Sequence, residues 1–297
     1  MAITIDDLPG AVPGSDLAMG SLRDLQRCNR RILQTLQKHH VPALGLVIES
    51  KLQVRSERDA RVAILEDWLT RNMELGNHTY SHTRFSKQSL EAFEEDTVKG
   101  EVVTKGLLSL HKKTEVYFRH PALDRGHNTE DRSIFESFLK SHGYQIAPVS
   151  VENADYEFND VLADARVNHL KRVAAQVKVL YLKHTEAMLD YVEASSRELF
   201  SREIPQILLI HDNELNAEVL DTLLTKFEQR GYHFVSLEEA LNDRAYGNRT
   251  EFDGNLGDCY LCWSNRLTAI RKVPQPGPEP PAWINKKFNE IRTRIGG

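Results

Sequence analysis

The sequence predicts an α/β protein built as a (β/α) barrel of seven parallel strands, complete or incomplete. Short apolar runs alternate with longer, charged segments in which apolar residues recur at helical spacing. This alternation indicates a parallel sheet or barrel. Polar residues suited to chemistry follow several of the apolar runs, at the end of a barrel where such residues gather. The length of 297 residues is enough for one large domain with a substantial core.

The individual elements follow from the length and pattern of each run. We expect strands at residues 2–6, 43–49, 73–77, 115–119, 144–149, 206–211 and 233–236. We expect helices at residues 21–40, 58–71, 87–111, 129–141, 214–230 and 237–242, with one or two long helices across 160–200.

The alternation ends near residue 245. We therefore expect one barrel domain over residues 1–245 and a C-terminal extension over 246–297 that packs on the barrel without forming an independent domain. Residues 273–281 are rich in proline and predict an extended strap, which leads to an amphipathic segment at 283–295.

Composition excludes several classes of partner. The formal net charge is -5, so no overall basic field favours nucleic acid. No apolar run approaches the roughly 20 residues needed to span a bilayer. No charged and apolar leader stands at the N-terminus, so the protein is either cytosolic or exported with its leader removed, and we expect a secreted or periplasmic protein. The sequence does not predict an oligomeric state.

Three cysteines do not make a disulfide framework. Cys259 and Cys262 form half of a zinc-site pattern without a second pair, and we interpret them as thiols of a C-terminal loop. Cys28 lies in a helical pattern and is expected to be a packed side chain.

One histidine pair and one aspartate predict a metal site. His78 and His82 are four residues apart, so on a helical turn both imidazoles could reach one ion. Asp7 ends an apolar strand and can supply a third ligand, which leaves positions open as a catalytic zinc site requires. Zn²⁺ is the expected metal, with Co²⁺, Ni²⁺ or Mn²⁺ as alternatives. Asn77 and Thr79 flank the first histidine and are expected to orient its ring.

Acid–base groups accompany the predicted metal site. Asp6 is the natural base, because a carboxylate beside a metal-activated water can take its proton. Arg119 ends an apolar strand, where burial requires a carboxylate partner that it would keep ionised. His211 ends the strand before a helix, and its near-neutral intrinsic pKa suits a general acid. Asp212 or Asn213 is expected to cap the helix that follows.

The other histidines are expected to play smaller parts. His39 and His40 end a helix and His111 stands in a basic turn, so all three are expected to be solvated. His120 and His127 follow the fourth strand and are weaker candidates for substrate contact.

These residues together resemble the motifs of the polysaccharide deacetylases of carbohydrate esterase family four, which share the NodB homology domain. The resemblance spans about residues 2–242. Four motifs match in the family's order: Thr4-Ile5-Asp6-Asp7 resembles TFDD, His78-Thr79-Tyr80-Ser81-His82 resembles H[ST]xxH, Arg119-His120-Pro121 resembles RxP, and Leu209-Ile210-His211 resembles LxH.

The resemblance implies a distorted (β/α)₇ barrel and metal-dependent removal of an N-acetyl or O-acetyl group from a carbohydrate such as chitin oligosaccharide, peptidoglycan or acetylated xylan. It implies an enzyme acting on carbon–nitrogen bonds other than peptide bonds. If the family's roles apply at the matching positions, the metal ligands are Asp7, His78 and His82. The catalytic residues are then Asp6 as the base, Arg119 as the residue that holds Asp6 in place, and His211 as the acid.

The resemblance also implies residues around the substrate. Leu209 would line the pocket for the acetyl methyl group, and the backbone N–H of Ala122 would bind the oxyanion. The family usually has an aromatic residue at the position of Ala122. One more motif, which stands fourth in the family's order of five, is less well matched: Asp155 would orient a catalytic partner, and Tyr156 stands where the family has tryptophan.

Two other functions fit the same residues. One is a related barrel amidohydrolase that acts on a small cyclic amide. The other is a catalytically inactive barrel that binds carbohydrate. Release of acetate and metal content would separate both from a deacetylase.

Overall fold

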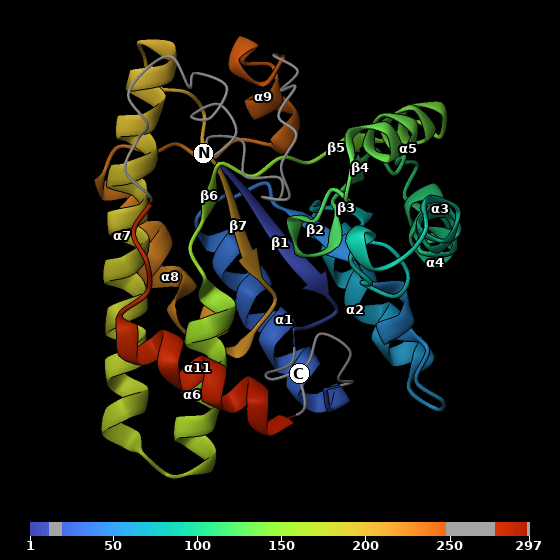
Figure 1. The fold of residues 1–297 in the computed structure, drawn as a ribbon. Helices are drawn as coiled ribbons and strands as arrows, with labels where there is room; N and C mark the ends of the chain where they lie inside the picture. Colours follow the sequence, from blue (N-terminus) through green and yellow to red (C-terminus); the bar gives the residue numbers. More distant parts are fainter. Residues whose placement is uncertain (12–19, 248–276, 296–297) are drawn as a thin grey trace.

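Seven parallel strands form a curled half-barrel surrounded by helices (Figure 1). The computed structural model describes residues 1–11, 20–247 and 277–295. The strands lie in the order β5-β4-β3-β2-β1-β7-β6, and every neighbouring pair is parallel. Their bounds are β1 (Ala2–Leu8), β2 (Leu44–Val47), β3 (Glu74–Asn77), β4 (Tyr117–Phe118), β5 (Gln145–Ile146), β6 (Val151–Glu152) and β7 (Ile207–His211).

Helices of the described chain follow most of the strands, as the alternation predicts. Their bounds are α1 (Leu22–Lys38), α2 (Arg58–Thr70), α3 (Leu90–Lys99), α4 (Val102–Leu110), α5 (Thr129–Ser141), α6 (Asp155–Val167), α7 (Lys171–Phe200), α8 (Glu214–Gln229), α9 (Leu237–Leu241) and α11 (Ala282–Ile295). Short 3₁₀ helices are η1 (Glu49–Leu52), η2 (Phe85–Lys87), η3 (Pro121–Leu123) and η4 (Arg244–Gly247). The helix expected at 87–111 is divided into α3 and α4 at Gly100.

One extended segment joins the two outer strands of the sheet. Only residues 147–150 separate β5, which pairs with β4, from β6, which pairs with β7. The chain therefore leaves one edge of the sheet and joins the other without a helix between them (Figure 1). The guanidinium of Arg119 donates from Nε to the carbonyl of Ala147 at 3.1 Å and from Nη2 to that of Pro148 at 3.4 Å, which holds this segment beside the end of β4.

The prediction of a strand at residues 233–236 is wrong. The seventh strand of the sheet is β6 instead. Residues 233–236 lie beside the start of β1, where the Met1 ammonium donates to the carbonyl of His233 at 2.6 Å and Val235 N–H donates to the carbonyl of Met1 at 3.0 Å. These contacts do not extend into a ladder. The apolar character of the segment reflects its packing against the sheet.

The main core lies between the sheet and helices α1, α2 and α8. Ile3 and Ile5 of β1, Leu33 of α1 and Trp68 of α2 are at most 1% exposed. Full burial of each such side chain contributes about 1.5–3 kcal/mol. Cys28 is buried in the same cluster as a free thiol, which confirms its expected packing role. Cys259 and Cys262 lie outside the described residues.

The C-terminal helix packs on α6. Ile284 and Ile291 of α11 are buried against Phe158 and Val161 of α6 and Tyr181 of α7. The helix agrees with the amphipathic segment expected at 283–295. Residues 277–281 before it form neither helix nor strand, and the rest of the expected strap, 273–276, lies outside the described residues.

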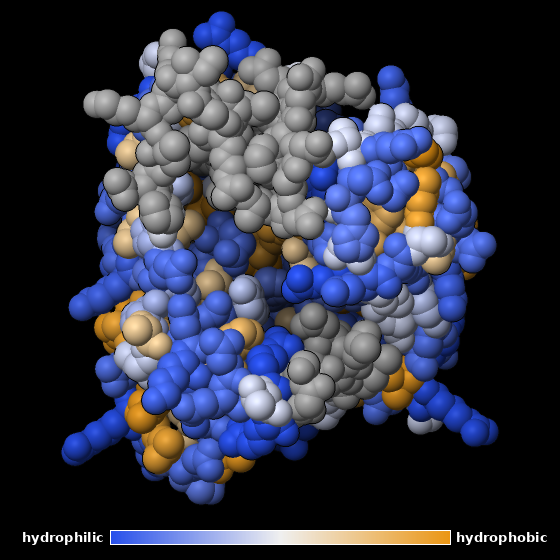
Figure 2. Space-filling model, viewed as in Figure 1, coloured by the Kyte–Doolittle hydropathy of each residue, from blue (hydrophilic) through white to orange (hydrophobic). Residues whose placement is uncertain are grey.

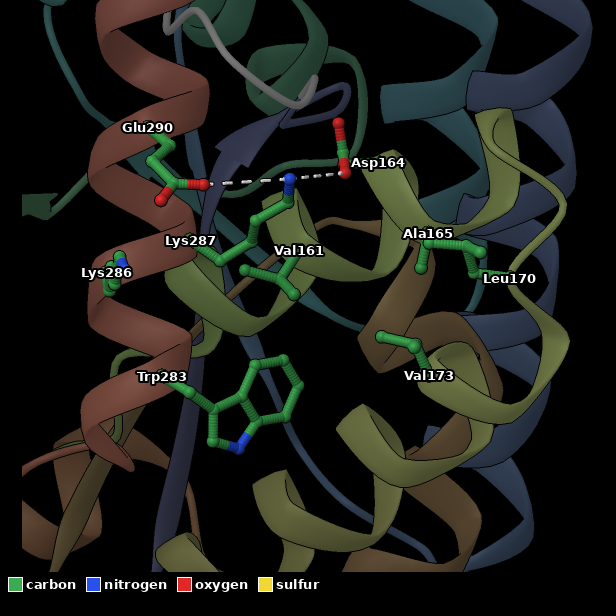
Figure 3. A pocket seen from close by; sticks show the side chains of 9 residues that line it. All are labelled: Val161, Asp164, Ala165, Leu170, Val173, Trp283, Lys286, Lys287 and Glu290. Atoms are coloured by element: carbon green, nitrogen blue, oxygen red, sulfur yellow. Dashed lines mark ion pairs between the residues drawn. The ribbon is translucent and has the colours of Figure 1, made fainter.

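A cavity of about 280 Å³ lies where α11 meets α6 and the start of α7 (Figure 3). Its lining is mostly apolar, with Trp283 on one side. Lys287 forms ion pairs at its edge with Asp164 at 3.3 Å and Glu290 at 3.8 Å. None of the expected site residues lines this cavity, so the predicted chemistry lies elsewhere.

Hydrophilic side chains dominate the face shown in Figure 2, with hydrophobic ones scattered among them. Among the helices of the described ranges, none is both long enough and apolar enough to cross a membrane.

Candidate active site

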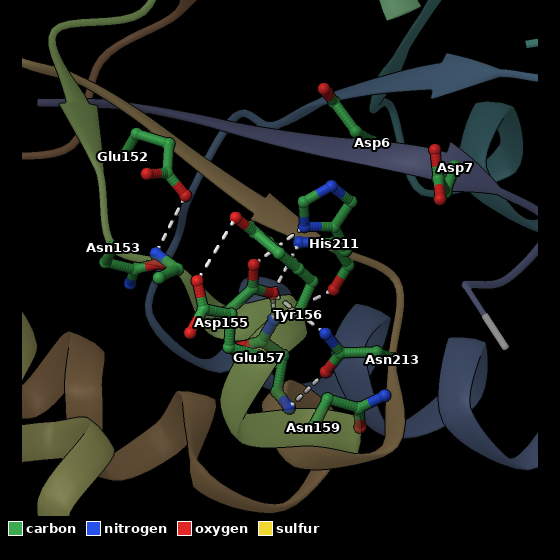
Figure 4. Close-up of polar contacts among 12 residues, drawn as sticks. Asp6, Asp7, Glu152, Asn153, Asp155, Tyr156, Glu157, Asn159, His211 and Asn213 are labelled. Atoms are coloured by element: carbon green, nitrogen blue, oxygen red, sulfur yellow. Dashed lines mark hydrogen bonds and ion pairs between the residues drawn. The ribbon is translucent and has the colours of Figure 1, made fainter. Parts of the chain in front are cut away.

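The candidate residues stand together at the carboxyl ends of the parallel strands. Asp6 and Asp7 lie near the end of β1, His78 follows β3, Arg119 follows β4, and His211 ends β7. Since all strands are parallel, these ends meet at one rim of the barrel. Figure 4 shows the two aspartates on β1 and the ring of His211 between them and the start of α6.

A bulge in β1 brings two consecutive carboxylates to one side. In a regular strand, neighbouring side chains point to opposite faces. Here Asp7 has φ 73°, and the register with β2 shifts between Ile5, opposite Gly45, and Leu8, opposite Val47. One extra residue is thereby accommodated in β1. As a result, carboxylate oxygens of both Asp6 and Asp7 lie within 4 Å of the His78 ring.

The histidine motif is a loop, so the helical turn expected for it is wrong. Residues 78–82 form no helix, and Thr79 and His82 have φ values of 64° and 60°. The two rings nevertheless converge, with centroids 4.8 Å apart. A loop with two left-handed residues thus achieves the convergence that the spacing suggested for a helix.

Helix α3 anchors this loop. The carboxylate of Asp96 accepts hydrogen bonds from the backbone N–H and hydroxyl of Ser81. The carbonyl of Asp96 accepts from Tyr80 N–H at 3.1 Å. A Cβ at Gly100 would lie 2.4 Å from the carbonyl carbon of Thr79, so only glycine permits α3 to end this close to the loop.

Asn77 and Thr79 stabilise the loop and not the ring of His78, contrary to expectation. Asn77 Oδ1 accepts from Thr79 N–H at 2.7 Å, and Thr79 Oγ1 accepts from His82 N–H at 3.0 Å. The ring of His78 is held by the carbonyl of Arg119, 2.8 Å from Nδ1.

Asp7, His78 and His82 form the one metal-ligating cluster found among the described residues, with candidate ligand atoms all within 4.8 Å of one another. Asp7 Oδ1 lies 3.4 Å from His82 Nε2 and 3.7 Å from His78 Nε2. Around a tetrahedral zinc with bonds of about 2.0–2.2 Å, ligand atoms stand roughly 3.3–3.6 Å apart. Asp7 Oδ1 is buried and accepts no hydrogen bond. These residues therefore fit a divalent metal.

The protonation states also suit metal ligands. A carbonyl only accepts, so His78 carries its proton on Nδ1 and turns the lone pair of Nε2 toward Asp7. Burial lowers the pKa of His78 and favours this neutral ring. Burial alone would raise the pKa of Asp7, but the charges of Lys51 and the nearby histidines outweigh it and hold the pKa well below its usual range.

Asp6 and Arg119 form the buried ion pair that the sequence predicts. Arg119 Nη1 donates to Asp6 Oδ1 at 2.6 Å, and its side chain is fully buried. The same nitrogen donates to Thr4 Oγ1 at 2.8 Å. Asp6 Oδ2 faces His78 Nε2 at 3.6 Å. One oxygen of Asp6 is thus engaged by Arg119, while the other faces the metal-ligating cluster.

His211 is oriented by Asp155, in agreement with the fourth motif. His211 Nδ1 lies 2.7 Å from Asp155 Oδ1, and His211 N–H donates to Asp155 Oδ2 at 2.9 Å. Asp155 also accepts hydrogen bonds from Asn213 and Asn216, which were not expected to take part. Asn213 caps α8 as expected, since its side chain accepts from Asn216 N–H.

The ion pair with Asp155 determines the protonation state of His211. Burial would lower the pKa of His211, but the carboxylate of Asp155, with smaller contributions from Asp7 and Asp6, raises it to about 10. The imidazole is therefore protonated at neutral pH in the metal-free protein, and its Nε2 proton is available on the side away from Asp155.

This pair makes a pH-dependent contribution to the stability of metal-free protein. The pKa of His211 is raised on folding, so the contribution is fully present below about pH 6.5, the unfolded value, and is lost as pH rises through about 10. We expect the urea midpoint of chelator-treated protein to fall over this window and the fall to be smaller in His211→Gln. Equal pH slopes for the two proteins would contradict the assignment.

The expected substrate residues lie in β7, in the loop after β4 and at the start of α6. Leu209 is buried in β7, two residues before His211 and so on the same face of the strand. Ala122 is exposed in η3, with φ 52°. Tyr156 of α6 meets His211 edge to face at 6.0 Å and Phe288 of α11 at 5.6 Å. The contact with Phe288 links α11 to the site.

Several other histidine predictions are corrected or refined. His39 is not solvated: its ring is 6% exposed and contacts Glu228 at 2.9 Å and Asp221 at 2.8 Å. Although burial opposes protonation, these hydrogen bonds raise the pKa of His39. His111 likewise contacts Glu66, at 2.6 Å.

His120 and His127 do not join the group around the metal-ligating cluster. His120 is fully buried and packs against the rings of Phe93, Phe118 and Phe135. His127 is exposed.

The sequence analysis missed one charged residue at this rim. Lys51 follows β2 and its Nζ lies 3.5 Å from Asp7 Oδ2, with a side chain 3% exposed. Its place soon after a strand resembles that of the other candidates, but nothing in the sequence shows that this lysine is buried.

Comparisons with known proteins agree with this geometry. A family model described as polysaccharide deacetylase matches residues 1–146. No match was found among curated protein sequences.

Among solved structures, a CE4 family pseudoenzyme from Bacillus anthracis has 18% sequence identity and a TM-score of 0.52, and the match covers 81% of this chain and 64% of that one. The polysaccharide deacetylase of Bacillus cereus has 16% identity and a TM-score of 0.50, with 79% and 90% covered. The chain thus spans somewhat less than two thirds of the length of the pseudoenzyme. These likenesses establish the fold.

The motifs at the rim, the half-barrel that carries them and the matching family model indicate the same family. Residues 1–146 of this chain, just under half of its 297 residues, match the polysaccharide deacetylase family model, and the motifs at the rim agree with that match.

Proposed function

We propose that the chain is a metal-dependent hydrolase that removes acetyl groups from an N-acetylated or O-acetylated carbohydrate. One observation carries the proposal. Around the metal-ligating cluster of Asp7, His78 and His82, the structure brings a paired aspartate and a paired histidine to the same rim. These groups form the set that hydrolysis of an acetyl group requires.

The cluster would hold one divalent cation, with zinc as the proposed metal and Co²⁺, Ni²⁺ or Mn²⁺ as alternatives. Such a cation would polarise the acetyl carbonyl and acidify a water molecule. His78 presents Nε2 because its Nδ1 donates to the carbonyl of Arg119. The protein thus supplies ligands whose orientation is already fixed.

Asp6 is proposed as the general base. Arg119 engages Oδ1 and leaves Oδ2 facing His78 Nε2 at 3.6 Å, beside the cluster where the attacking water would be bound. Asp6 would accept a proton from a water molecule as that water attacks the acetyl carbon. Arg119 positions Asp6 and also donates to the carbonyl of Ala147 in the segment between β5 and β6.

His211 is proposed as the general acid. Asp155 binds its Nδ1 proton, so Nε2 delivers the other proton to the departing nitrogen or oxygen of the sugar. The carboxylate of Asp155 raises the pKa of His211 and so favours this protonated form. The backbone N–H of Ala122 is proposed to bind the developing oxyanion, and Leu209 is proposed to contact the acetyl methyl group.

An acetate-release assay tests the proposal. Chitin oligosaccharides, peptidoglycan and acetylated xylan are the substrates, with the protein as purified, after treatment with a chelator and after addition of zinc. We expect acetate from at least one substrate, loss of release with the chelator and recovery with zinc. Release that is unaffected by the chelator would contradict the metal-dependent function.

An inactive carbohydrate-binding barrel is the second candidate, because CE4 family pseudoenzymes are among the structures similar to this one. The retained cluster, Asp6–Arg119 pair and His211–Asp155 pair favour an active enzyme, since binding alone does not require them. Binding of the same oligosaccharides without acetate release, in zinc-loaded protein, would instead favour this candidate.

A further inference from the structure

Lys51 is a buried lysine that contacts Oδ2 of the candidate metal ligand Asp7. Its Nζ lies 3.5 Å from Asp7 Oδ2 and donates to the carbonyls of Gly10 at 3.1 Å and Asp7 at 3.4 Å. A buried ammonium is costly unless it is paired and hydrogen-bonded. These three acceptors meet that requirement, so the lysine is part of a built arrangement.

The two oxygens of Asp7 serve different neighbours. Oδ1 faces His78 and His82, accepts no hydrogen bond and is buried. Oδ2 faces Lys51. Lys51 therefore draws one oxygen away from the histidines and leaves the other for a metal ion.

Hydrogen bonds connect the backbone around Lys51 to β1, to the histidine loop and to α2. Ile48 N–H donates to the carbonyl of Leu8 in β1 at 3.0 Å, and Ser50 N–H donates to the carbonyl of Tyr80 in the histidine loop at 3.0 Å. The carbonyl of Lys51 accepts from Nη1 of Arg61, itself buried in α2, at 3.1 Å. These hydrogen bonds fix the position of the Lys51 backbone relative to Asp7.

Three carboxylates of the site each have a cationic partner of their own. Asp212 lies close by and is also buried, and burial raises its pKa to about 8. The three pairs are Asp6 with Arg119, Asp155 with His211, and Asp7 with Lys51.

We propose that Lys51 is a positioning residue that limits the affinity of the site for its divalent metal. It holds Asp7 so that a single oxygen faces the histidines, and its fixed positive charge opposes a second cation nearby. Coulomb repulsion of this kind is strong where water is largely excluded. The inference rests on the metal-dependent function proposed above.

Metal affinity of Lys51→Met tests the proposal directly. The methionine has similar length and no charge. We expect the dissociation constant for zinc, measured on metal-stripped protein by competition with a chromophoric chelator, to decrease at least tenfold. A merely structural role predicts the opposite sign, because a disturbed Asp7 would bind zinc more weakly.

Lys38→Met is the matched control, since it removes the same charge from an exposed lysine on α1 that pairs with Asp221. Its zinc affinity should remain within twofold of the wild type. Circular dichroism of each metal-stripped variant verifies folding. Lys51→Gln, which can still donate a hydrogen bond, carries the same expectation if Lys51→Met does not fold.

The outcomes separate the two proposals. A wild type that binds zinc, with a folded Lys51 variant that binds it equally or more weakly, would overturn this inference and leave the proposed function intact. A wild type that binds none of zinc, cobalt, nickel and manganese would overturn the proposed function and this inference with it.

Discussion

Replacing Asp7 by alanine is expected to abolish both metal binding and acetate release. Asp7 supplies the only carboxylate of the cluster found in the described residues, and its buried Oδ1 faces both histidines. Without it, two imidazoles remain, too few for a stable catalytic site. Metal content of the purified variant and its acetate release measure the two losses. His78→Ala should behave in the same way.

A surface aspartate provides the control for this result. Asp59 of α2 has a fully exposed side chain, and Asp59→Ala should keep the metal content and the rate of the wild type. Acetate release at the wild-type rate from metal-free Asp7→Ala would show that the cluster is not the catalytic centre.

Asp6→Asn is expected to keep the metal and lose the rate. The amide is nearly isosteric with the carboxylate, so the cluster of Asp7, His78 and His82 should remain assembled. It cannot act as a base, and loss of general base catalysis lowers kcat by about 100- to 10,000-fold. Steady-state kinetics on the substrate identified above, together with zinc content, separate this effect from loss of metal.

The substitution also removes the negative partner of Arg119, which is fully buried. Stability should therefore fall, since a buried charge would be left without its counterion. A thermal melt checks that the variant is folded at the assay temperature. A variant that retains zinc and folds, but turns over at the wild-type rate, would exclude Asp6 as the base.

Much of the site could be predicted from the sequence because its chemistry follows strand ends. Asp6, Asp7, His78, Arg119 and His211 are charged or metal-ligating residues directly after apolar runs, and parallel strands bring such positions to one rim. The ion pair of Arg119 followed from the cost of burying a guanidinium.

The local backbone could not be predicted in the same way. The spacing of His78 and His82 suits a helical turn, yet the loop takes left-handed conformations at Thr79 and His82, which are uncommon away from glycine. What stabilises them is the contact with α3, including the close approach at Gly100. Such contacts depend on segments distant in the chain.

Short strands and buried charges were missed for related reasons. Strand β6 consists of Val151 and Glu152 alone, too short to produce an alternating pattern, whereas the apolar residues of 233–236 pack beside the sheet without joining its ladder. Lys51 is hydrophilic by type, and only the fold shows that its side chain is buried against Asp7.

X-ray absorption at the zinc edge of the zinc-loaded protein tests the metal centre most directly. The arrangement of Asp7, His78 and His82 predicts nitrogen and oxygen neighbours at about 2.0–2.2 Å, with the outer scattering of two imidazole rings, and no sulfur. Sulfur neighbours at about 2.3 Å, or a spectrum unchanged in Asp7→Ala, would place the bound zinc on other residues and contradict the assignment.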